Sequence, residues 1–233
     1  MYGDKNPKIT GAGIKNRLKL NQVIHVKDGS TCRDYWTICA NQIGELAIME
    51  EDANGNKTSE YFTDIKYPWH TESNSFSHSN TRQPLHTDGS YESNAPNISF
   101  FYCKERPEYG GETIFIDGNS LQRMLHFYFP DLLKRLQTEQ VLHSKGNDSK
   151  RNSIINNDKF TWNYYRCEDC PLRQEFHDFL EKHIILGNLF QGIRLNVGEA
   201  LFFKDEELLH GRTSFLGNRW LVKGGIHVRQ NDC

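Results

Sequence analysis

The segment "HTDGS" (residues 86–90) places an imidazole and a carboxylate two positions apart, just before a glycine. In an extended strand, residues i and i+2 face the same way, so His86 and Asp88 can project into one space while Thr87 points to the other side. An Asp-Gly pair is also a common hairpin-turn signal. Taken alone, the segment therefore fits either a turn or half of a metal site.

A metal site needs a third ligand, and the segment "ALFFKDEELLHGRTSF" (200–215) offers His210 at the end of an apolar run. Two imidazoles and one carboxylate on one face leave three coordination positions open. This is the ligand set of non-haem Fe(II) oxygenases. The alternative interpretation of His210 is an ordinary histidine at a strand end.

Three segments in this order make a more specific pattern: "LHTDGSYESNAPNISFFYC" (85–103), "GGETIFID" (110–117) and "LLHGRTSFLGNRWLVKGG" (208–225). Together they resemble the taurine dioxygenase and clavaminate synthase group of Fe(II)/2-oxoglutarate-dependent oxygenases. The resemblance covers about residues 80–230, and residues 1–79 carry little recognisable signal. It implies a mainly β fold with flanking helices, a double-stranded β-helix of the jelly-roll, cupin-like type.

The resemblance also implies roles for individual side chains. Three of them would bind the iron: His86, Asp88 and His210. Thr113 and Arg219 match the family residues that hold the distal carboxylate of 2-oxoglutarate, and a planar guanidinium suits such a carboxylate because it can form two parallel hydrogen bonds. The interval from His210 to Arg219 is shorter than is usual in the family, which leaves Arg212 and Arg229 as alternatives.

The activity that the resemblance implies uses Fe(II), 2-oxoglutarate and O2, releases succinate and CO2, and hydroxylates an unactivated C–H bond of a small polar metabolite. Halogenases of the superfamily lack the carboxylate ligand. Because Asp88 is present, hydroxylation, desaturation or ring formation is expected rather than chlorination.

Charged and aromatic residues indicate where a substrate could bind. If "FTWNYYRC" (160–167) is a strand, then Trp162, Tyr164 and Arg166 share a face, and Arg166 is a candidate for a substrate carboxylate because arginine is rarely buried unpaired. An aromatic core strand explains Trp162 and Tyr164 equally well. Lys223 lies four residues beyond Arg219, where sulfonate-oxidising relatives hold the substrate anion. These residues favour an amino acid or a similar zwitterion.

Three other functions remain open at this stage. They are a sulfonate dioxygenase within the same family, a non-catalytic metal- or ligand-binding cupin-like barrel, and a zinc hydrolase with the same ligands. Thr113 and Arg219 favour an oxygenase, because only a dicarboxylate cosubstrate needs them. A separate Cys/His set, "CEDCPLRQEFHDFLEKH" (167–183), resembles a zinc finger only superficially, since His177 and His183 are six apart on an expected helix and face different sides.

Length and composition limit the class of protein and its partners. The 233 residues suit one oxygenase domain (1–233), with a core at about 80–230 and residues 1–79 packing onto it. Lys plus Arg is 28 and Asp plus Glu is 30, a balance that gives no reason to expect nucleic acid as a partner. The short apolar runs and polar N-terminus predict no membrane segment and no secretory signal, hence a cytoplasmic protein with cysteine thiols. Nothing in the sequence indicates an oligomeric state.

Local patterns predict the elements that position these residues. Expected strands include 17–26, 97–103 and 109–117, followed by further strands and glycine turns from residue 190 onward. Expected helices are 31–44 with Thr31 as its cap, a pair broken before Pro130, and one beginning near Pro171. An Asn-Gly turn at 54–55 predicts a hairpin, and the polar segments 70–84 and 144–158 are expected to be loops that act as lids.

Overall fold

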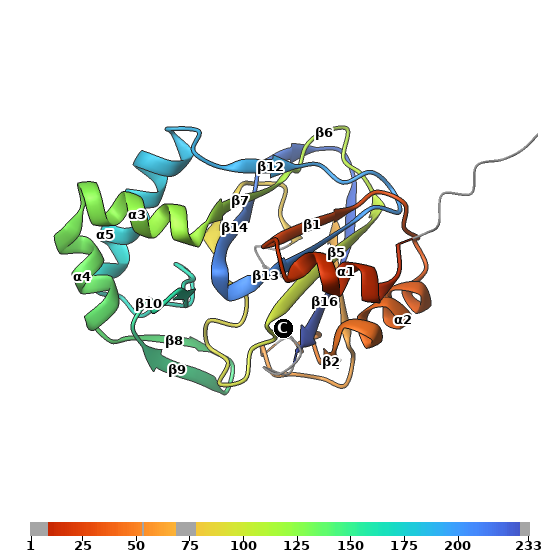
Figure 1. Ribbon diagram of the computed structural model, residues 1–233, viewed down its shortest axis with the longest axis horizontal. Coiled ribbons are helices and arrows are strands. Elements are labelled where there is room, and N and C mark those ends of the chain that lie inside the picture. Colours follow the sequence, from red (N-terminus) through yellow and green to blue (C-terminus); the bar gives the residue numbers. More distant parts are fainter. Residues whose placement is uncertain (1–8, 53, 69–77, 229–233) are drawn as a thin grey trace, which may run out of the picture.

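The computed structural model describes residues 9–52, 54–68 and 78–228, and its strands form two main antiparallel sheets (Figure 1). The larger sheet has six strands: β1 (Val23–Val26), β13 (Ala200–Lys204), β5 (Ile98–Glu105), β16 (Arg219–His227), β2 (Glu45–Ala47) and β3 (Phe62–Tyr67). The smaller sheet has four: β12 (Gln191–Ile193), β7 (Thr113–Asp117), β14 (Leu208–Arg212) and β4 (Gln83–His86). Side chains from both sheets meet in one buried cluster, which confirms the predicted jelly-roll fold.

Helices cover the outer faces of the two sheets, as Figure 1 shows. The larger sheet is covered by α1 (Gly11–Leu18) and α2 (Arg33–Ile43). The smaller sheet is covered by α3 (Gly118–Tyr128), α4 (Pro130–Thr138) and α5 (Pro171–Phe179), which continues as a π-helical segment (Leu180–Ile185). The predicted break before Pro130 and the helix start at Pro171 are confirmed, because proline at the first helical position loses no intrahelical hydrogen bond.

Short two-stranded sheets complete the described chain. They are β6 (Tyr109–Gly110) with β15 (Phe215–Leu216), β8 (Val141–Lys145) with β9 (Asp148–Asn152), and β10 (Ile155–Asn156) with β11 (Lys159–Phe160). A 3₁₀ turn (Asp205–Glu207) joins β13 to β14. No helix in the described ranges is both long and apolar enough to cross a membrane.

Strand β5 explains why the run "NISFFYC" is apolar without interruption. Phe100 and Tyr102 pack outward in the cluster that contains Trp36 of α2, and Phe101 and Cys103 pack inward between the sheets. Burying a large apolar side chain contributes roughly 2 kcal/mol, so a strand buried on both faces has no polar positions to alternate with apolar ones.

Successive side chains of a strand point to opposite faces of its sheet, and this alternation determines which side chains enter the interior between the sheets. On β14, Leu208 belongs to the interior cluster and Leu209 to the outer one, so His210 points inward. On β16, Leu221 lies in the interior cluster, and Arg219 and Lys223 share its side of the strand. The sheet pattern thus directs residues that are distant in sequence into one space.

The predicted strand 17–26 is wrong in its first half. Residues up to Leu18 belong to helix α1, whose N-cap Thr10 accepts a hydrogen bond from the amide of Gly13. Ile14 and Leu18 are four residues apart and buried on one helix face. The predicted Thr31 cap is also wrong, since α2 begins at Arg33 with Cys32 at a cap position that makes no side-chain hydrogen bond.

The polar segment 144–158, predicted as a loop, instead contains most of the β8–β9 hairpin and β10. Gly146 adopts φ of +58° at the turn, a conformation that glycine reaches without steric strain. The pattern is polar because this hairpin is solvated on much of its surface. Much of the other predicted lid, 70–84, lies outside the described residues, but β4 begins within it at Gln83.

His143 on β8 gives a prediction about stability. Its side chain is fully buried, and neither ring nitrogen has a hydrogen-bond partner among the described residues. Burial, and then the charge of Lys150, lower the pKa of His143 to about 4. The unfolded chain, with a histidine pKa near 6.5, therefore binds the proton first as the pH falls, and stability is lost from pH 6.5 toward pH 4.

We expect the free energy of unfolding to fall by about 2 kcal/mol between pH 7.5 and pH 5 from this one group. Replacing it in the variant His143→Leu should remove that part of the pH dependence in urea denaturation. The exposed His126 provides the matched control, because His126→Leu should leave the difference unchanged. Equal pH dependence in wild type and His143→Leu would contradict the prediction.

Candidate metal centre

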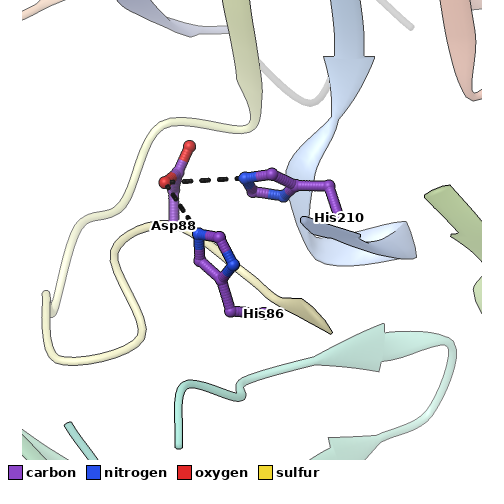
Figure 2. Close-up of side chains that lie close together, drawn as sticks. All are labelled: His86, Asp88 and His210. Atoms are coloured by element: carbon purple, nitrogen blue, oxygen red, sulfur yellow. Dashed lines mark ion pairs between the residues drawn. The ribbon is translucent and has the colours of Figure 1, made fainter. Parts of the chain in front are cut away.

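The three candidate ligands meet because β4 and β14 are neighbours in the smaller sheet. His210 of β14 is the cross-strand partner of His86 of β4, and Asp88 follows β4 by two residues. One ligand atom from each lies within 4.8 Å of the other two. Asp88 Oδ1 is 3.8 Å from Nε2 of both histidines (Figure 2). The long-range contact that the sequence resemblance required is therefore present.

Hydrogen bonds orient the His86 and Asp88 side chains toward this point. The Nδ1 atom of His86 lies 2.9 Å from the carbonyl oxygen of Pro84, which leaves Nε2 on the Asp88 side. Ser99 Oγ donates to Asp88 Oδ2 at 2.9 Å, so Oδ1 faces the histidines. Such outer contacts fix the tautomer and direction of metal-binding side chains.

Thr87, between the two ligands, is held on the opposite side of the backbone, as the strand pattern predicted. Its amide donates to the carbonyl oxygen of Trp162 at 2.7 Å, and its hydroxyl accepts from the Trp162 amide at 3.0 Å. The backbone of Trp162 thereby fixes the segment that carries His86 and Asp88.

The electrostatics of the cluster suit a divalent cation. Burial lowers the pKa of both His86 and His210, so both imidazoles are neutral and keep a lone pair for a metal. Burial alone would raise the pKa of Asp88, but the positive charge of Lys223, whose Nζ lies 2.6 Å from Asp88 Oδ1, lowers it, and the carboxylate stays ionised. Two neutral nitrogens and one carboxylate oxygen fit Fe(II). Among the described residues, no other group of three or more His, Cys, Asp or Glu has this proximity.

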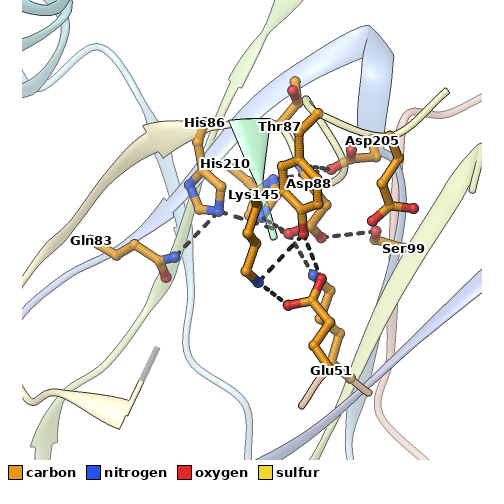
Figure 3. A network of polar contacts seen from close by, with 12 residues as sticks. Glu51, Gln83, His86, Thr87, Asp88, Ser99, Lys145, Asp205 and His210 are labelled. Atoms are coloured by element: carbon orange, nitrogen blue, oxygen red, sulfur yellow. Dashed lines mark hydrogen bonds and ion pairs between the residues drawn. The ribbon is translucent and has the colours of Figure 1, made fainter. Parts of the chain in front are cut away.

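A cavity of about 970 Å³ opens onto the three side chains. Its wall includes Lys223, Tyr164 and Arg166 of the predicted substrate residues, together with Glu51 and Lys145. In its wall Lys145 forms an ion pair with Glu51 (Figure 3), and Tyr91 donates a hydrogen bond to Glu51 at 2.7 Å. Glu51 and Lys57 form an antiparallel bridge, and the tip of the β8–β9 hairpin thus contacts this second hairpin, 51–57, in the cavity wall.

Thr113 and Arg219 do not line this cavity, and both are buried. Thr113 on β7 pairs with Arg212 on β14, and the guanidinium groups of Arg212 and Arg219 lie 5.1 and 5.5 Å from the centre of the Phe215 ring. Burial, and then the charge of Arg212, lower the pKa of Arg219 to about 9.

The two buried arginines differ in their partners. Arg212 donates to the carbonyl oxygens of Ser79 and Thr81 at 2.8 and 2.7 Å. Arg219, in contrast, has no carboxylate within ion-pair distance among the described residues, although it is only 5% exposed. A buried guanidinium without an anion is costly, which makes Arg219 the better fit to a bound carboxylate. The third alternative, Arg229, lies outside the described residues.

The predicted strand at 160–167 is wrong beyond Phe160. Residues 163–166 form a turn, in which the amide of Arg166 donates to the carbonyl oxygen of Asn163 at 3.0 Å. Trp162 is fully buried against Phe176 and does not line the cavity, so it does not share a face with Arg166. Lys223 lines the cavity, with its Nζ 2.6 Å from Asp88 Oδ1.

Asp205, which no sequence pattern had indicated, contacts both ligand-bearing segments. Its Oδ1 accepts from the amide of Asp88 at 3.1 Å and lies 3.4 Å from Nδ1 of His210. Figure 3 shows this carboxylate beside the ligands. The available signal was an acidic residue five positions before His210, but it begins the run "DEE", which suggests a solvated turn.

Solved structures share this architecture. PvcB from Pseudomonas aeruginosa is 17% identical with a TM-score of 0.70, over 96% of this chain and 84% of that chain; a second structure describes PvcB as an Fe, alpha-ketoglutarate-dependent oxygenase from an isonitrile synthetic pathway. Asparagine oxygenase in complex with Fe(II), 3-hydroxyasparagine and succinate is 14% identical with a TM-score of 0.73, over 93% and 77%. The non-haem iron oxygenase OrfP with hydroxyarginine is 12% identical with a TM-score of 0.68, over 94% and 81%. At these identities the likeness shows the fold.

Sequence comparison gives the family. No curated protein matches the chain. Residues 37–224, most of the chain, match the family described as taurine catabolism dioxygenase TauD, TfdA family. This range contains His86, Asp88 and His210 as well as Thr113 and Arg219, and it agrees with the resemblance of the three sequence segments. The protein therefore belongs to the TauD/TfdA family of dioxygenases.

Proposed function

We propose that this protein is an Fe(II)- and 2-oxoglutarate-dependent dioxygenase that hydroxylates an unactivated C–H bond of an amino acid or a similar small zwitterion. Membership in the TauD/TfdA family supports the enzyme class. The observation that carries the proposal is the convergence of His86, Asp88 and His210, with an ionised carboxylate between two neutral imidazoles.

In this proposal the three side chains hold Fe(II) and leave three coordination positions for small molecules. Arg219 binds the distal carboxylate of 2-oxoglutarate, and Thr113 supplies a hydroxyl to the same carboxylate. Supporting observations are the burial of both side chains and the lack of an anionic partner for Arg219 among the described residues. When bound, iron and 2-oxoglutarate supply the O2-dependent oxidation that yields succinate and CO2.

The chain itself contributes positioning and exclusion of water. Phe101 and Phe203 contact the His210 ring, at centroid distances of 6.2 and 4.8 Å, and keep one side of the site apolar. The ion pair between Lys145 and Glu51 joins two hairpins in the cavity wall. We propose that the substrate enters between these two hairpins.

The substrate class follows from the charges of the cavity wall. Arg166 lines the cavity and has no ion-pair partner among the described residues, so it is available for a substrate carboxylate. Glu51 and Glu92 also line the wall, where they form ion pairs with Lys145 and Lys57, and a substrate ammonium group would compete with these lysines for them. Asparagine oxygenase and OrfP, which share the fold, are solved with hydroxylated amino acids, and this supports the same class here.

Succinate release tests the proposed function. Purified protein with Fe(II), 2-oxoglutarate and O2 should release succinate when supplied with a member of a panel of free amino acids. Alkyl sulfonates form the second arm of the panel, and release with sulfonates alone would favour the sulfonate dioxygenase. Folded, iron-loaded protein that releases no succinate with any compound would favour the non-catalytic barrel.

Arg166 gives a prediction within this assay. Because hydrogen bonds to charged groups contribute about 1.5–3 kcal/mol, Arg166→Gln should raise KM for the amino acid roughly tenfold to a hundredfold, with a smaller effect on kcat. Arg151→Gln is the matched control, since Arg151 bonds Glu168 on the surface and does not line the cavity. An unchanged KM in Arg166→Gln would exclude Arg166 as the carboxylate anchor.

A further inference from the structure

We propose that Asp205 is a positioning residue for the metal centre, and that its carboxylate holds the His210 ring and the Asp88 backbone in one arrangement. The inference rests on the proposed function, in which His210 and Asp88 bind the iron. Asp205 lies outside the three segments that carry the family resemblance, and it is not a metal ligand in this account.

The geometry places one oxygen atom between two parts of the site. Asp205 opens the 3₁₀ turn before β14, and its side chain is 1% exposed. Its Oδ1 accepts a hydrogen bond from the amide of Asp88 at 3.1 Å, across 117 residues of sequence, and lies 3.4 Å from Nδ1 of His210. The amide of Asp205 itself donates to the carbonyl oxygen of Asn97 at 3.1 Å, which ties the turn to the start of β5.

The Nδ1 atom of His210 is buried and forms no hydrogen bond with the described residues, and Asp205 Oδ1, 3.4 Å away, favours the tautomer that carries its proton on Nδ1. The lone pair then sits on Nε2, which faces Asp88 Oδ1 at 3.8 Å. The same tautomer is favoured in His86, because its Nδ1 lies next to the carbonyl oxygen of Pro84. A carboxylate partner makes a ligating imidazole a stronger donor than a carbonyl partner does, and loss of such partners typically weakens metal binding 10- to 100-fold.

The burial of Asp205 distinguishes it from its neighbours in the acidic run. Glu206 pairs with Lys159 and Glu207 pairs with Lys204 at the surface. An ionisable group buried at this depth costs folding free energy unless its contacts compensate, and an asparagine would occupy the same turn at lower cost. The carboxylate is therefore explained by what it does to His210 and Asp88 rather than by the turn.

The test is an anaerobic titration of the metal-free protein with Co(II), a redox-stable probe for the Fe(II) site. Asp205→Asn keeps the shape of the side chain and replaces one carboxyl oxygen with an amide group that can only donate a hydrogen bond. We expect it to weaken Co(II) binding by about 10- to 100-fold. Glu207→Gln makes the same change on the same turn without touching the ligands, and it should bind Co(II) as the wild type does. His210→Ala reports on the metal centre itself and should lose binding.

The outcomes separate the two proposals. Wild-type affinity in Asp205→Asn, with loss in His210→Ala, would overturn the role of Asp205 and leave the metal centre in place. Equal weakening in Asp205→Asn and Glu207→Gln would also overturn it, since the effect would then be one of net charge. Wild-type affinity in His210→Ala would instead contradict the metal centre.

A second measurement starts from the wild-type protein. Nitrogen-15 NMR of histidine in the metal-free wild-type protein reports the tautomer of each ring. We expect His210 to carry its proton on Nδ1, and Asp205→Asn to shift the ring toward the other tautomer. A His210 ring protonated on Nε2 in the wild type would overturn the proposal. A purely structural role for Asp205 predicts no change of tautomer.

Discussion

Replacing His210 with alanine is expected to reduce substrate-dependent succinate release by a factor on the order of a thousand or more. Losses of this size are typical when one of several residues that act together in catalysis is removed. The imidazole is one of three protein ligands, and the two that remain, His86 and Asp88, come from one short segment and do not enclose the metal. The binding of Fe(II) should weaken in parallel with the loss of activity.

The measurement is succinate release together with iron content after gel filtration. His210 is 3% exposed, so alanine leaves a cavity, and near-ultraviolet circular dichroism should be compared to confirm the fold. His210→Gln, which preserves more of the volume, should show the same loss. His227→Ala, at the far end of β16, is the control and should retain both iron and activity. Activity retained in a folded His210→Ala protein would refute the assignment of this ligand.

Replacing Arg219 with lysine is expected to raise KM for 2-oxoglutarate by roughly tenfold to a hundredfold. Lysine keeps the positive charge but cannot form two parallel hydrogen bonds to a carboxylate. Arg219 is buried, and the described residues offer it no anion, so the cosubstrate carboxylate is the partner that would offset its burial. Arg219→Ala should lose more affinity, because it removes the charge as well.

Arg212→Lys distinguishes the two candidate arginines in the same assay. The Arg212 guanidinium donates to the carbonyl oxygens of Ser79 and Thr81, so its replacement should affect stability more than KM for 2-oxoglutarate. A larger rise of KM in Arg212→Lys than in Arg219→Lys would reassign the carboxylate anchor to Arg212.

The sequence predicted the site better than it predicted the local elements around it. His86 and Asp88 are two residues apart, and the period of a strand suffices to place them together. His210 is more than a hundred residues away, and no local pattern specifies that it pairs with His86 across β4 and β14. Its prediction depended on the ordered resemblance of three segments, because register between distant strands is decided by packing of the whole interior.

The errors have local physical causes. "RLKLNQVIHV" alternates like a strand, but Ile14 and Leu18 lie one helical turn apart, and packing against α2 makes residues up to Leu18 helical. "FTWNYYRC" is rich in strand-forming aromatic residues, yet the backbone of Trp162 bonds Thr87 and the chain then turns. In both cases tertiary contacts outweighed propensity.

Asp205 could not be predicted from the sequence for a different reason. The run "DEE" suggests three solvated carboxylates, and only the fold separates one of them from the other two. The first residue of the turn faces the interior because β13 ends at Lys204 and β14 leads directly to His210. Burial of a single ionisable side chain of this kind depends on chain direction at a strand end, which composition does not encode.

Anaerobic addition of Fe(II) and 2-oxoglutarate to the purified protein tests the central claim most directly, because an iron–keto-acid chelate has a weak visible charge-transfer band. The account predicts that the band appears only when both are present, and that His210→Ala and Asp88→Ala lack it. Folded wild-type protein that binds iron but shows no band with 2-oxoglutarate, or a band that persists in His210→Ala, would contradict the account.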